Sequence, residues 1–256
     1  MQKLSVVIIC KNSASVIGKT LQSFAGLTDD IVVYDNGSTD YTLEIAKQNG
    51  ANVFSGSWQG FGKTKNNANG LAKYDWILSL DADEAIDEEL KNTLLLLPFN
   101  DDKVVYDISF KTFLGDKYLK HGEWAADHHV RLFNRNEVKW NYSAVHEELI
   151  MPDEIRIEKL KGYVLHRTAE NFLAYKKKMI EYASLNAEKY YKQGKQLWWG
   201  QQWISPVFSF LQNYIFRVGF LDGKAGFTRA HITAVYTFLK YKKLKELMNN
   251  EQMNKE

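Results

Sequence analysis

The chain has 256 residues, of which 33 are Lys or Arg, 31 are Asp or Glu, and 45% are hydrophobic. This length suits one large domain, or one domain with an extension, around a sizeable core. A charged fraction of 25% with 14% aromatic residues argues against intrinsic disorder. The net charge of +2 does not indicate nucleic-acid binding. A single cysteine, Cys10, excludes an internal disulfide and a zinc site built from cysteines.

The N-terminus predicts neither a secretory signal nor a membrane anchor. The apolar run over residues 4–10 is short, and Lys11 and Asn12 follow it directly, without a small-residue cleavage site. No stretch approaches the ~18 uninterrupted apolar residues of a membrane-spanning helix. We therefore expect the protein to stay in the cytoplasm.

The first hundred residues predict strands and helices in alternation. A continuous β-branched run such as residues 4–10 is typical of a buried parallel strand. Strands are expected over residues 4–10, 31–35, 52–54 and 76–80, and helices over about 13–24, 39–49, 63–72 and 88–97. This order predicts a mainly parallel α/β sheet that binds ligands beyond the C-terminal ends of its strands.

From residue 104 the pattern changes to short strands and then to helices. Strands are expected over residues 104–110, 130–133, 138–142 and 163–166, and helices over about 169–191 and 206–247. A domain boundary is therefore expected near residue 167.

Carboxylates stand at the ends of two expected strands. Asp35 ends one, and Asp81 ends another and begins the run Asp81-Ala-Asp83-Glu84. In an extended segment Asp81 and Asp83 project to the same side, where they repel each other unless a cation or proton lies between them. An isolated Asp-x-Asp is usually a solvated turn, but its place after a buried strand favours Mg²⁺ or Mn²⁺. Because these ions complete their shell with phosphate and water, a nucleotide diphosphate is the expected ligand.

Four ordered motifs resemble those of family 2 glycosyltransferases, which have the GT-A fold. They cover residues 4–12, 33–40, 63–70 and 80–84. Segments 131–135, 140–142, 145–149 and 219–227 resemble the branch that includes lipopolysaccharide-core β-glucosyltransferases. The resemblance implies a Rossmann-like, mainly parallel sheet with a small mixed-strand region and a C-terminal helical extension. The implied catalytic domain is 1–167, with a nucleotide-binding half 1–100 and an acceptor-side half 101–167, and the extension is 168–256.

The resemblance also implies the residues that bind the donor. Asp35 would hold the nucleobase, with Asn12 nearby. Lys65 stands where many relatives carry Arg and would contact the nucleotide or diphosphate without the bidentate fork of Arg. Asp81 would face the ribose and the metal, and Asp83 would bind the metal that bridges the diphosphate.

The segment 145–149 would supply the catalytic base. The resemblance points to Glu147, and Glu148 is its rival, because neighbouring side chains of a strand face opposite ways. Glycosyl transfer needs a stabilised leaving diphosphate, which a metal provides. It also needs a deprotonated acceptor hydroxyl, which one carboxylate provides. One base opposite the leaving group suits a single displacement with inversion at the anomeric carbon.

Other polar and aromatic residues have two interpretations each. His166 ends an expected strand and is a candidate contact for the diphosphate or metal, although a lone His is more often structural. His146 has the same two interpretations. Arg131 would contact the acceptor or sugar, or pair with an acid such as Glu123. Trp140 is a candidate to stack on a sugar ring, although Trp is also common in cores.

The C-terminal region is rich in aromatic residues followed by lysines. Residues 197–216 include three Trp, and Lys240, Lys242, Lys243 and Lys245 follow them. Aromatic side chains beside basic ones are typical of helices that lie in a membrane interface. The alternative is that this apolar face packs on the catalytic domain or on a second subunit.

The leading hypothesis is an inverting, metal-dependent glycosyltransferase with a nucleotide-sugar donor, expected to be UDP-linked. Its acceptor would be a bacterial surface glycan or lipopolysaccharide core, free or lipid-linked, at the inner face of the cytoplasmic membrane. No nucleic acid is expected as a partner. One alternative is a nucleotidyltransferase, which would need a glycine-rich basic loop that residues 10–15 lack. The other is a non-catalytic membrane-peripheral protein of the same fold, which Asp81, Asp83 and Glu147 argue against.

Overall fold

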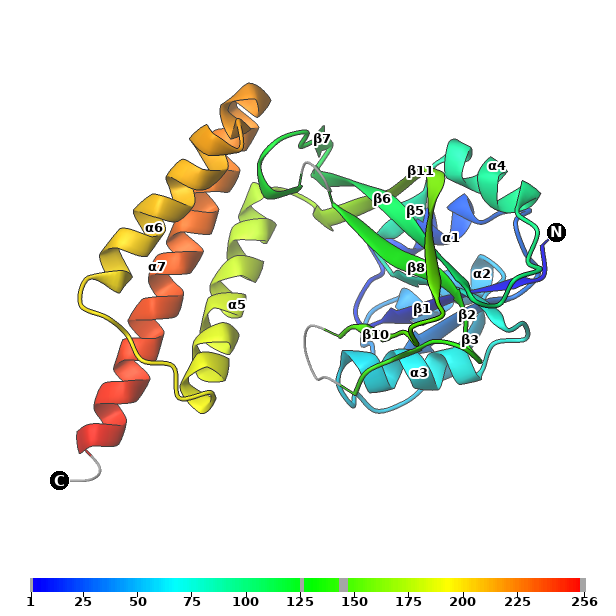
Figure 1. Cartoon of the computed structure of the whole chain (residues 1–256), viewed down its shortest axis with the longest axis horizontal. Coiled ribbons are helices and arrows are strands. Elements are labelled where there is room, and N and C mark those ends of the chain that lie inside the picture. Colours follow the sequence, from blue (N-terminus) through cyan, green and yellow to red (C-terminus); the bar gives the residue numbers. More distant parts are fainter. Residues whose placement is uncertain (1, 125–126, 143–146, 254–256) are drawn as a thin grey trace. The chain divides into compact units, whose positions relative to one another are not determined.

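The computed structural model describes residues 2–124, 127–142 and 147–253, which form two compact units (Figure 1). Residues 1–110 and 127–166 belong to the first, which we call the sheet unit. Residues 111–126 and 167–256 belong to the second, the helical unit. The segment 111–126, expected within the acceptor-side half, therefore groups with the C-terminal helices. The assignment of nucleotide binding to residues 1–100 and of acceptor binding to residues 101–167 stays a prediction.

The first half of the sheet unit alternates strands and helices as predicted. Its strands are β1 (Leu4–Cys10), β2 (Ile31–Asp35), β3 (Asn52–Ser55) and β4 (Trp76–Asp81). Its helices are α1 (Ile17–Ser23), α2 (Thr42–Gln48), α3 (Phe61–Gly70) and α4 (Glu88–Leu96). The four strands pair in parallel in the order β3-β2-β1-β4. The carboxyl ends of β1, β2 and β4 therefore lie at the same edge of the sheet.

The alternating side chains of β1 explain why helices cover both faces of this sheet. Leu4, Val6 and Ile8 belong to one buried cluster with residues of α1, α2 and α4. Val7 and Ile9 belong to a second cluster that includes residues of α3. Because side chains alternate along a strand, a strand buried on both faces needs apolar residues throughout. The predicted α/β architecture is confirmed.

The second half continues the same sheet with antiparallel strands. These are β5 (Glu84–Ile86), β6 (Val104–Leu114), β7 (Lys117–Tyr118), β8 (His128–Asn134) and β11 (Arg156–Ala169). The strand order continues from β4 as β8-β6-β11-β5, and β8 is antiparallel to both β4 and β6. A separate antiparallel pair is formed by β9 (Lys139–Trp140) and β10 (Leu149–Ile150). The mixed-strand region thus extends the parallel sheet and brings β8 beside β4.

The helical unit contains α5 (Phe172–Lys192), α6 (Gln201–Leu211) and α7 (Gly223–Met253). A π-helical turn, η2 (Gln212–Phe216), and a 3₁₀ helix, η3 (Gly219–Asp222), connect α6 to α7. α7 packs against both α5 and α6 and lies between them (Figure 1). In the part of the chain that the structure describes, no helix combines the length and the apolar character needed to cross a membrane.

The prediction of one helix over residues 206–247 is wrong, because the chain turns between α6 and α7. Val218 and Gly223 adopt left-handed backbone angles, with φ of 49° and 60°. A Cβ atom on Gly226 would lie 1.9 Å from the carbonyl oxygen of Gly219, so only glycine allows this contact between η3 and α7. Glycines therefore separate two helices that the apolar pattern joins.

Candidate active site

The turn after β2 is organised by the carboxylate of Asp35. Its Oδ2 accepts hydrogen bonds from the backbone N–H groups of Gly37 and Ser38, both at 3.0 Å. Its Oδ1 accepts the Ser38 hydroxyl at 2.5 Å and faces the Cys10 thiol at 3.7 Å. Gly37 has a φ of 87°, which glycine adopts without strain. The residue predicted to hold the nucleobase is therefore also the residue that shapes this turn.

Asn12 binds the same turn from the end of β1. Its backbone N–H donates to Ser38 Oγ, and its Oδ1 accepts the backbone N–H of Thr39, both at 2.8 Å. The structure thus brings Asn12 and Asp35 to one turn, whereas their contact with a nucleotide stays a prediction. Because both oxygens of Asp35 already accept hydrogen bonds, a nucleobase would share or displace one of these donors.

Acidic and basic groups from several strands meet where β4 ends. The backbone N–H of Asp81 donates to Glu84 Oε2 at 2.9 Å. The guanidinium of Arg131, on β8, lies 3.0 Å from Glu84 Oε1 and 3.8 Å from Asp81 Oδ2. On β11, His166 Nε2 lies 3.4 Å from Asp83 Oδ2. Burial lowers the pKa of His166, but the hydrogen bond to Asp83 together with the negative charges of Asp83, Glu84 and Asp81 outweighs burial and leaves this pKa above its ordinary value.

Burial and neighbouring cations together set the pKa values of the Asp81 and Glu84 carboxyl groups. Burial alone would raise the pKa of Asp81, but the charges of Lys65 and Arg131 lower it to about 2. Burial raises the pKa of Glu84 despite the charge of Arg131 beside it. Asp81 therefore stays ionised at neutral pH, as a ligand of a divalent cation must be.

Lys65 connects the predicted metal ligand with the predicted base. It lies on α3, and its side chain is only 2% exposed. Its Nζ donates to Glu147 Oε1 at 2.8 Å and lies 3.4 Å from Asp81 Oδ1. The same ammonium lies 4.8 Å from the centroid of the Trp140 ring. A buried ammonium needs such partners, because removing it from water is costly.

One face of α3 holds the segment that carries Trp140. Asn66 Nδ2 donates to the carbonyl oxygen of Trp140 at 2.8 Å, and the Trp140 backbone N–H donates to Asn66 Oδ1 at 3.0 Å. A Cβ atom on Gly62 would lie 1.7 Å from the carbonyl oxygen of Asn141. Residues three and four positions apart share a helix face. Gly62, Lys65 and Asn66 therefore form the face of α3 against which the segment of Trp140 and Asn141 packs.

The two candidate bases differ in their surroundings. Both line a pocket of about 430 Å³. The Glu147 side chain is 16% exposed and is paired with Lys65. The Glu148 side chain is exposed, and its backbone carbonyl accepts the N–H of Asn141 at 2.8 Å. His146 lies outside the described residues.

Two donors in the wall of this pocket are buried without partners among the described residues. They are Arg131 Nε and Trp140 Nε1. A buried donor that lacks an acceptor costs free energy. Trp140 is almost fully buried and belongs to a core cluster, as the alternative to stacking on a sugar predicts.

Asp81 and Asp83 suit a divalent cation as a partial ligand shell. Within the described residues, no three His, Cys, Asp or Glu side chains form a group that could hold a metal alone. In the same part of the chain, the buried Asp81 Oδ1 makes no hydrogen bond of good geometry, and its ion-pair partner is Lys65 Nζ at 3.4 Å. Mg²⁺ usually takes one or two carboxylates and completes its shell with phosphate and water. The residues therefore fit a metal that binds together with a diphosphate.

Glu84 has a role that the sequence analysis did not assign. It belongs to the acidic motif, but its side chain turns inward to Arg131 and to the backbone of Asp81. Arg131, for which Glu123 was one expected partner, thus pairs with an acid 47 residues away. No local spacing of residues could have indicated this pair.

Known proteins resemble this chain along most of its length. The model of the family "Glycosyl transferase family 2" matches residues 5–182. An uncharacterized glycosyltransferase of Rickettsia prowazekii is 30% identical, over 98% of this chain and 90% of the relative. The lipopolysaccharide core biosynthesis glycosyltransferase LpsC of Rhizobium meliloti is 27% identical, over 92% and 89%. A crystal structure of TarS from S. aureus is 16% identical with a TM-score of 0.46, over 94% and 92%.

Family membership favours glycosyl transfer over the two alternatives, nucleotidyl transfer and a non-catalytic role. The family match covers well over half of the chain, and the Rickettsia relative aligns with nearly all of it. The protein therefore belongs to family 2 of the glycosyltransferases.

Proposed function

We propose that the protein is an inverting, metal-dependent glycosyltransferase that moves a sugar from a UDP-sugar to a bacterial surface-glycan acceptor. The observation that carries this proposal is the contact of one buried ammonium, Lys65 Nζ, with both Glu147 and Asp81. A carboxylate able to accept a proton thus lies near a carboxylate able to hold a cation and its diphosphate. A single displacement at the anomeric carbon needs both functions in one site.

Glu147 is the proposed base that activates the acceptor. The acceptor hydroxyl oxygen attacks the anomeric carbon from the face opposite the diphosphate, while its proton moves to a carboxylate oxygen of Glu147. The bond from the anomeric carbon to the diphosphate oxygen breaks, and its electron pair leaves with the diphosphate. One displacement inverts the configuration. A positioned general base contributes roughly 10²–10⁴-fold to such a rate.

Asp81 and Asp83 are the proposed ligands of the metal. When bound, Mg²⁺ or Mn²⁺ would act as a Lewis acid toward the departing diphosphate. Lys65 and Arg131 add positive charge beside Asp81. Charge-assisted hydrogen bonds to phosphate oxygens are strong, so the unpaired Nε of Arg131 is a suitable donor.

Three further residues complete the proposed donor site. Asn12 and Asp35 shape the turn proposed to receive the nucleobase. His166, beside Asp83, is a proposed diphosphate contact. Glu148 is the alternative base, and its exposure beside the same pocket keeps it in contact with solvent rather than with Lys65.

An acceptor of the lipopolysaccharide-core class is supported by the name of one relative. A lipopolysaccharide core biosynthesis glycosyltransferase aligns with 92% of this chain. An acceptor of this class is built on lipid. The enzyme would therefore meet it at the inner face of the cytoplasmic membrane.

Thermal unfolding with UDP, with and without Mn²⁺, tests the donor site. We expect Mn²⁺ to increase the UDP-dependent rise in Tm, because a ligand that binds only the folded state stabilises it. Asp83→Asn should lose the increase caused by Mn²⁺. The control is Asp153→Asn, which changes an exposed acid outside the site. Equal responses of the wild type and Asp83→Asn would refute the metal-dependent function.

A further inference from the structure

Helix α6 and its flanking residues expose a continuous set of large apolar side chains, which we call the aromatic face. Each of these side chains is between 49% and 94% exposed. The aromatic face comprises Trp198, Trp199, Trp203, Ile204, Val207, Phe208, Ile215 and Phe216. Large exposed apolar patches mark binding surfaces, so this face requires a partner.

The spacing of residues separates the aromatic face from the side of α6 that packs on α7. Ile204, Phe208 and Ile215 follow helical spacing and are exposed. Phe210 points the other way, since its ring lies 5.7 Å from that of Phe227 on α7. Because α7 lies between α5 and α6, none of the helices described in this unit covers the far side of α6 (Figure 1).

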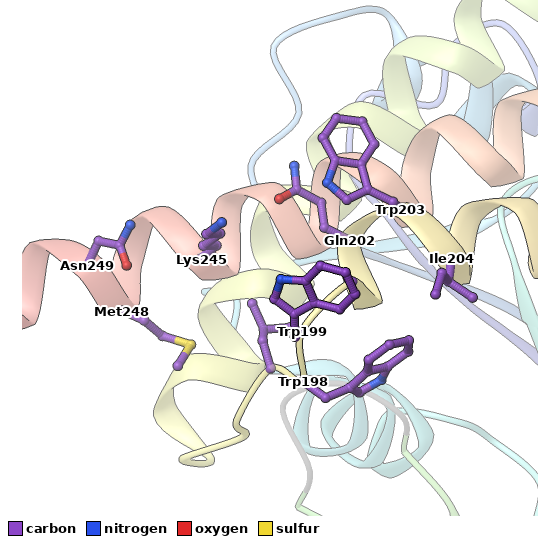
Figure 2. A pocket seen from close by; sticks show the side chains of 10 residues that line it. Trp198, Trp199, Gln202, Trp203, Ile204, Lys245, Met248 and Asn249 are labelled. Atoms are coloured by element: carbon purple, nitrogen blue, oxygen red, sulfur yellow. The ribbon is translucent and has the colours of Figure 1, made fainter.

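The N-terminal end of the aromatic face contains a pocket of about 580 Å³ (Figure 2). Trp198, Trp199 and Trp203 line it from the start of α6, and Lys245 and Met248 line it from α7. Figure 2 shows these indole rings grouped beside the α7 side chains. The pocket thus offers apolar and aromatic walls together with a cationic side chain.

The charge of this region is mainly positive. Between residues 197 and 246 the sequence has seven basic residues and two acidic residues, Asp222 and Glu246, of which Glu246 lies 3.7 Å from the ammonium of Lys243. The Asp222 carboxylate accepts the backbone N–H groups of His121 at 2.9 Å and Lys120 at 3.2 Å, and is therefore occupied within the helical unit. The partner of the aromatic face should consequently be both apolar and anionic.

We propose that the aromatic face docks on an anionic phospholipid bilayer, with α6 lying in the interface and Lys242 and Lys245 near the lipid phosphates. Trp and Phe side chains enter the boundary between headgroups and acyl chains, while lysines remain at the surface. This inference rests on the lipid-linked acceptor of the proposed function and identifies the surface that would bring the enzyme to it.

A second copy of the chain fits this face less well than a bilayer. A two-fold interface places the same patch of both copies together. Two copies would then bring two sets of seven basic residues close to one another, with two acidic residues in each set. An anionic bilayer neutralises those charges and covers the apolar side chains at the same time.

Sedimentation of the full chain with vesicles tests this proposal. Vesicles of phosphatidylglycerol and phosphatidylcholine are compared with vesicles of phosphatidylcholine alone, without donor, acceptor or metal. We expect at least tenfold tighter binding to the anionic vesicles. Trp199→Ala combined with Phe216→Ala should weaken binding at least tenfold, and Lys242→Gln combined with Lys245→Gln about threefold.

Leu96→Ala is the matched control, because Leu96 is an exposed apolar residue of the sheet unit. It should bind vesicles as the wild type does. No sedimentation of the wild type, or equal binding by the Trp199 and Phe216 variant, would overturn the proposal. A wild-type dimer that this variant converts to a monomer would overturn it in favour of a second copy. Glu147→Gln should bind vesicles normally, so failure here is distinguishable from failure of the proposed transfer reaction.

Discussion

Buried charge and exposed aromatic side chains lie in different units of this protein. In the sheet unit, Lys65, Glu84 and Arg131 are buried and lie within one cluster of ion pairs. In the helical unit, Trp199 is 94% exposed and belongs to a larger aromatic face. Both arrangements reverse the usual distribution of residue types, in which charge is outside and large apolar groups are inside.

The two reversals differ in how their free-energy cost is offset. The buried charges have partners within the fold, so the sheet unit holds a polar site away from water. The aromatic face stays largely exposed within the described part of the helical unit, where Trp203 contacts Phe238 of α7, so only binding to something else can cover the rest of it. The first arrangement indicates chemistry inside the protein, and the second indicates an interface.

If the buried charges serve catalysis, Glu147→Gln should produce the largest effect. Losing the general base should lower the rate of glycosyl transfer roughly 10²–10⁴-fold, while UDP still raises the Tm. Single-turnover rates and thermal unfolding measure the two quantities. Glu148→Gln is the control and should keep most activity. An inactive Glu148→Gln beside an active Glu147→Gln would show that the base is Glu148.

If the sheet unit is closed to solvent, its single thiol should react slowly. Burial and the nearby charge of Asp35 raise the pKa of Cys10 to about 12, from a usual value of 9.0. The thiolate fraction at pH 8 is then roughly 10³-fold smaller in the folded state, because each pKa unit is tenfold. Alkylation of Cys10 should therefore be at least roughly 10³-fold slower in the folded protein than in the protein unfolded by urea. Rapid labelling of the native protein would contradict a closed sheet unit.

Removing one partner of the buried ion pairs should destabilise the sheet unit. Arg131→Leu leaves Glu84 and Asp81 without this cation and should lower the free energy of unfolding by about 3–5 kcal/mol. Urea unfolding of the wild type and the variant measures this difference in the free energy of unfolding. The double variant Arg131→Leu with Glu84→Leu should recover most of the loss, and a loss as large as in the single variant would contradict the pairing.

The pH dependence of the Arg131→Leu variant follows from the direction of the Glu84 shift. Burial raises the folded-state pKa of Glu84 above its unfolded value of 4.5, so folding favours its protonated form. The penalty of its charge is absent below pH 4.5 and grows as pH rises through the folded-state pKa. The loss of stability should therefore be smaller at pH 5 than at pH 8.

The smallest effect on stability should come from the aromatic face. Phe216→Ala should change the free energy of unfolding by no more than about 0.5 kcal/mol, because the ring is exposed. Phe133→Ala, a buried phenylalanine of the sheet unit, should lose about 3–5 kcal/mol. Urea unfolding of both variants makes the comparison. A loss above about 2 kcal/mol for Phe216→Ala would show that this face packs within the fold.

Local patterns predicted the parallel half of the sheet and the position of its carboxylates. The apolar run that forms β1 could be read directly, and Asp35 and Asp81 follow similar runs. The start of β11 was missed because Arg156, Glu158 and other charged residues interrupt its apolar pattern on an exposed segment. The break between α6 and α7 was missed because it depends on close contacts of glycines.

The contacts that build the candidate site could not be predicted in this way. Lys65 and Glu147 are 82 residues apart, and Arg131 and Glu84 are 47 residues apart. The family resemblance proposed separate roles for Lys65, Asp81 and Glu147. It did not indicate that one ammonium contacts both carboxylates.

Local sequence patterns specify most strands and helices of the sheet unit and the carboxylates that end β2 and β4. These features depend on the spacing of apolar residues within segments of about ten residues. Long-range packing sets the features that these patterns lack: Glu84 turns toward Arg131, Lys65 lies between Asp81 and Glu147, and the aromatic face is left uncovered. Whether a charge is paired or an aromatic ring is exposed depends on which distant segments pack around it, and no local pattern contains that information.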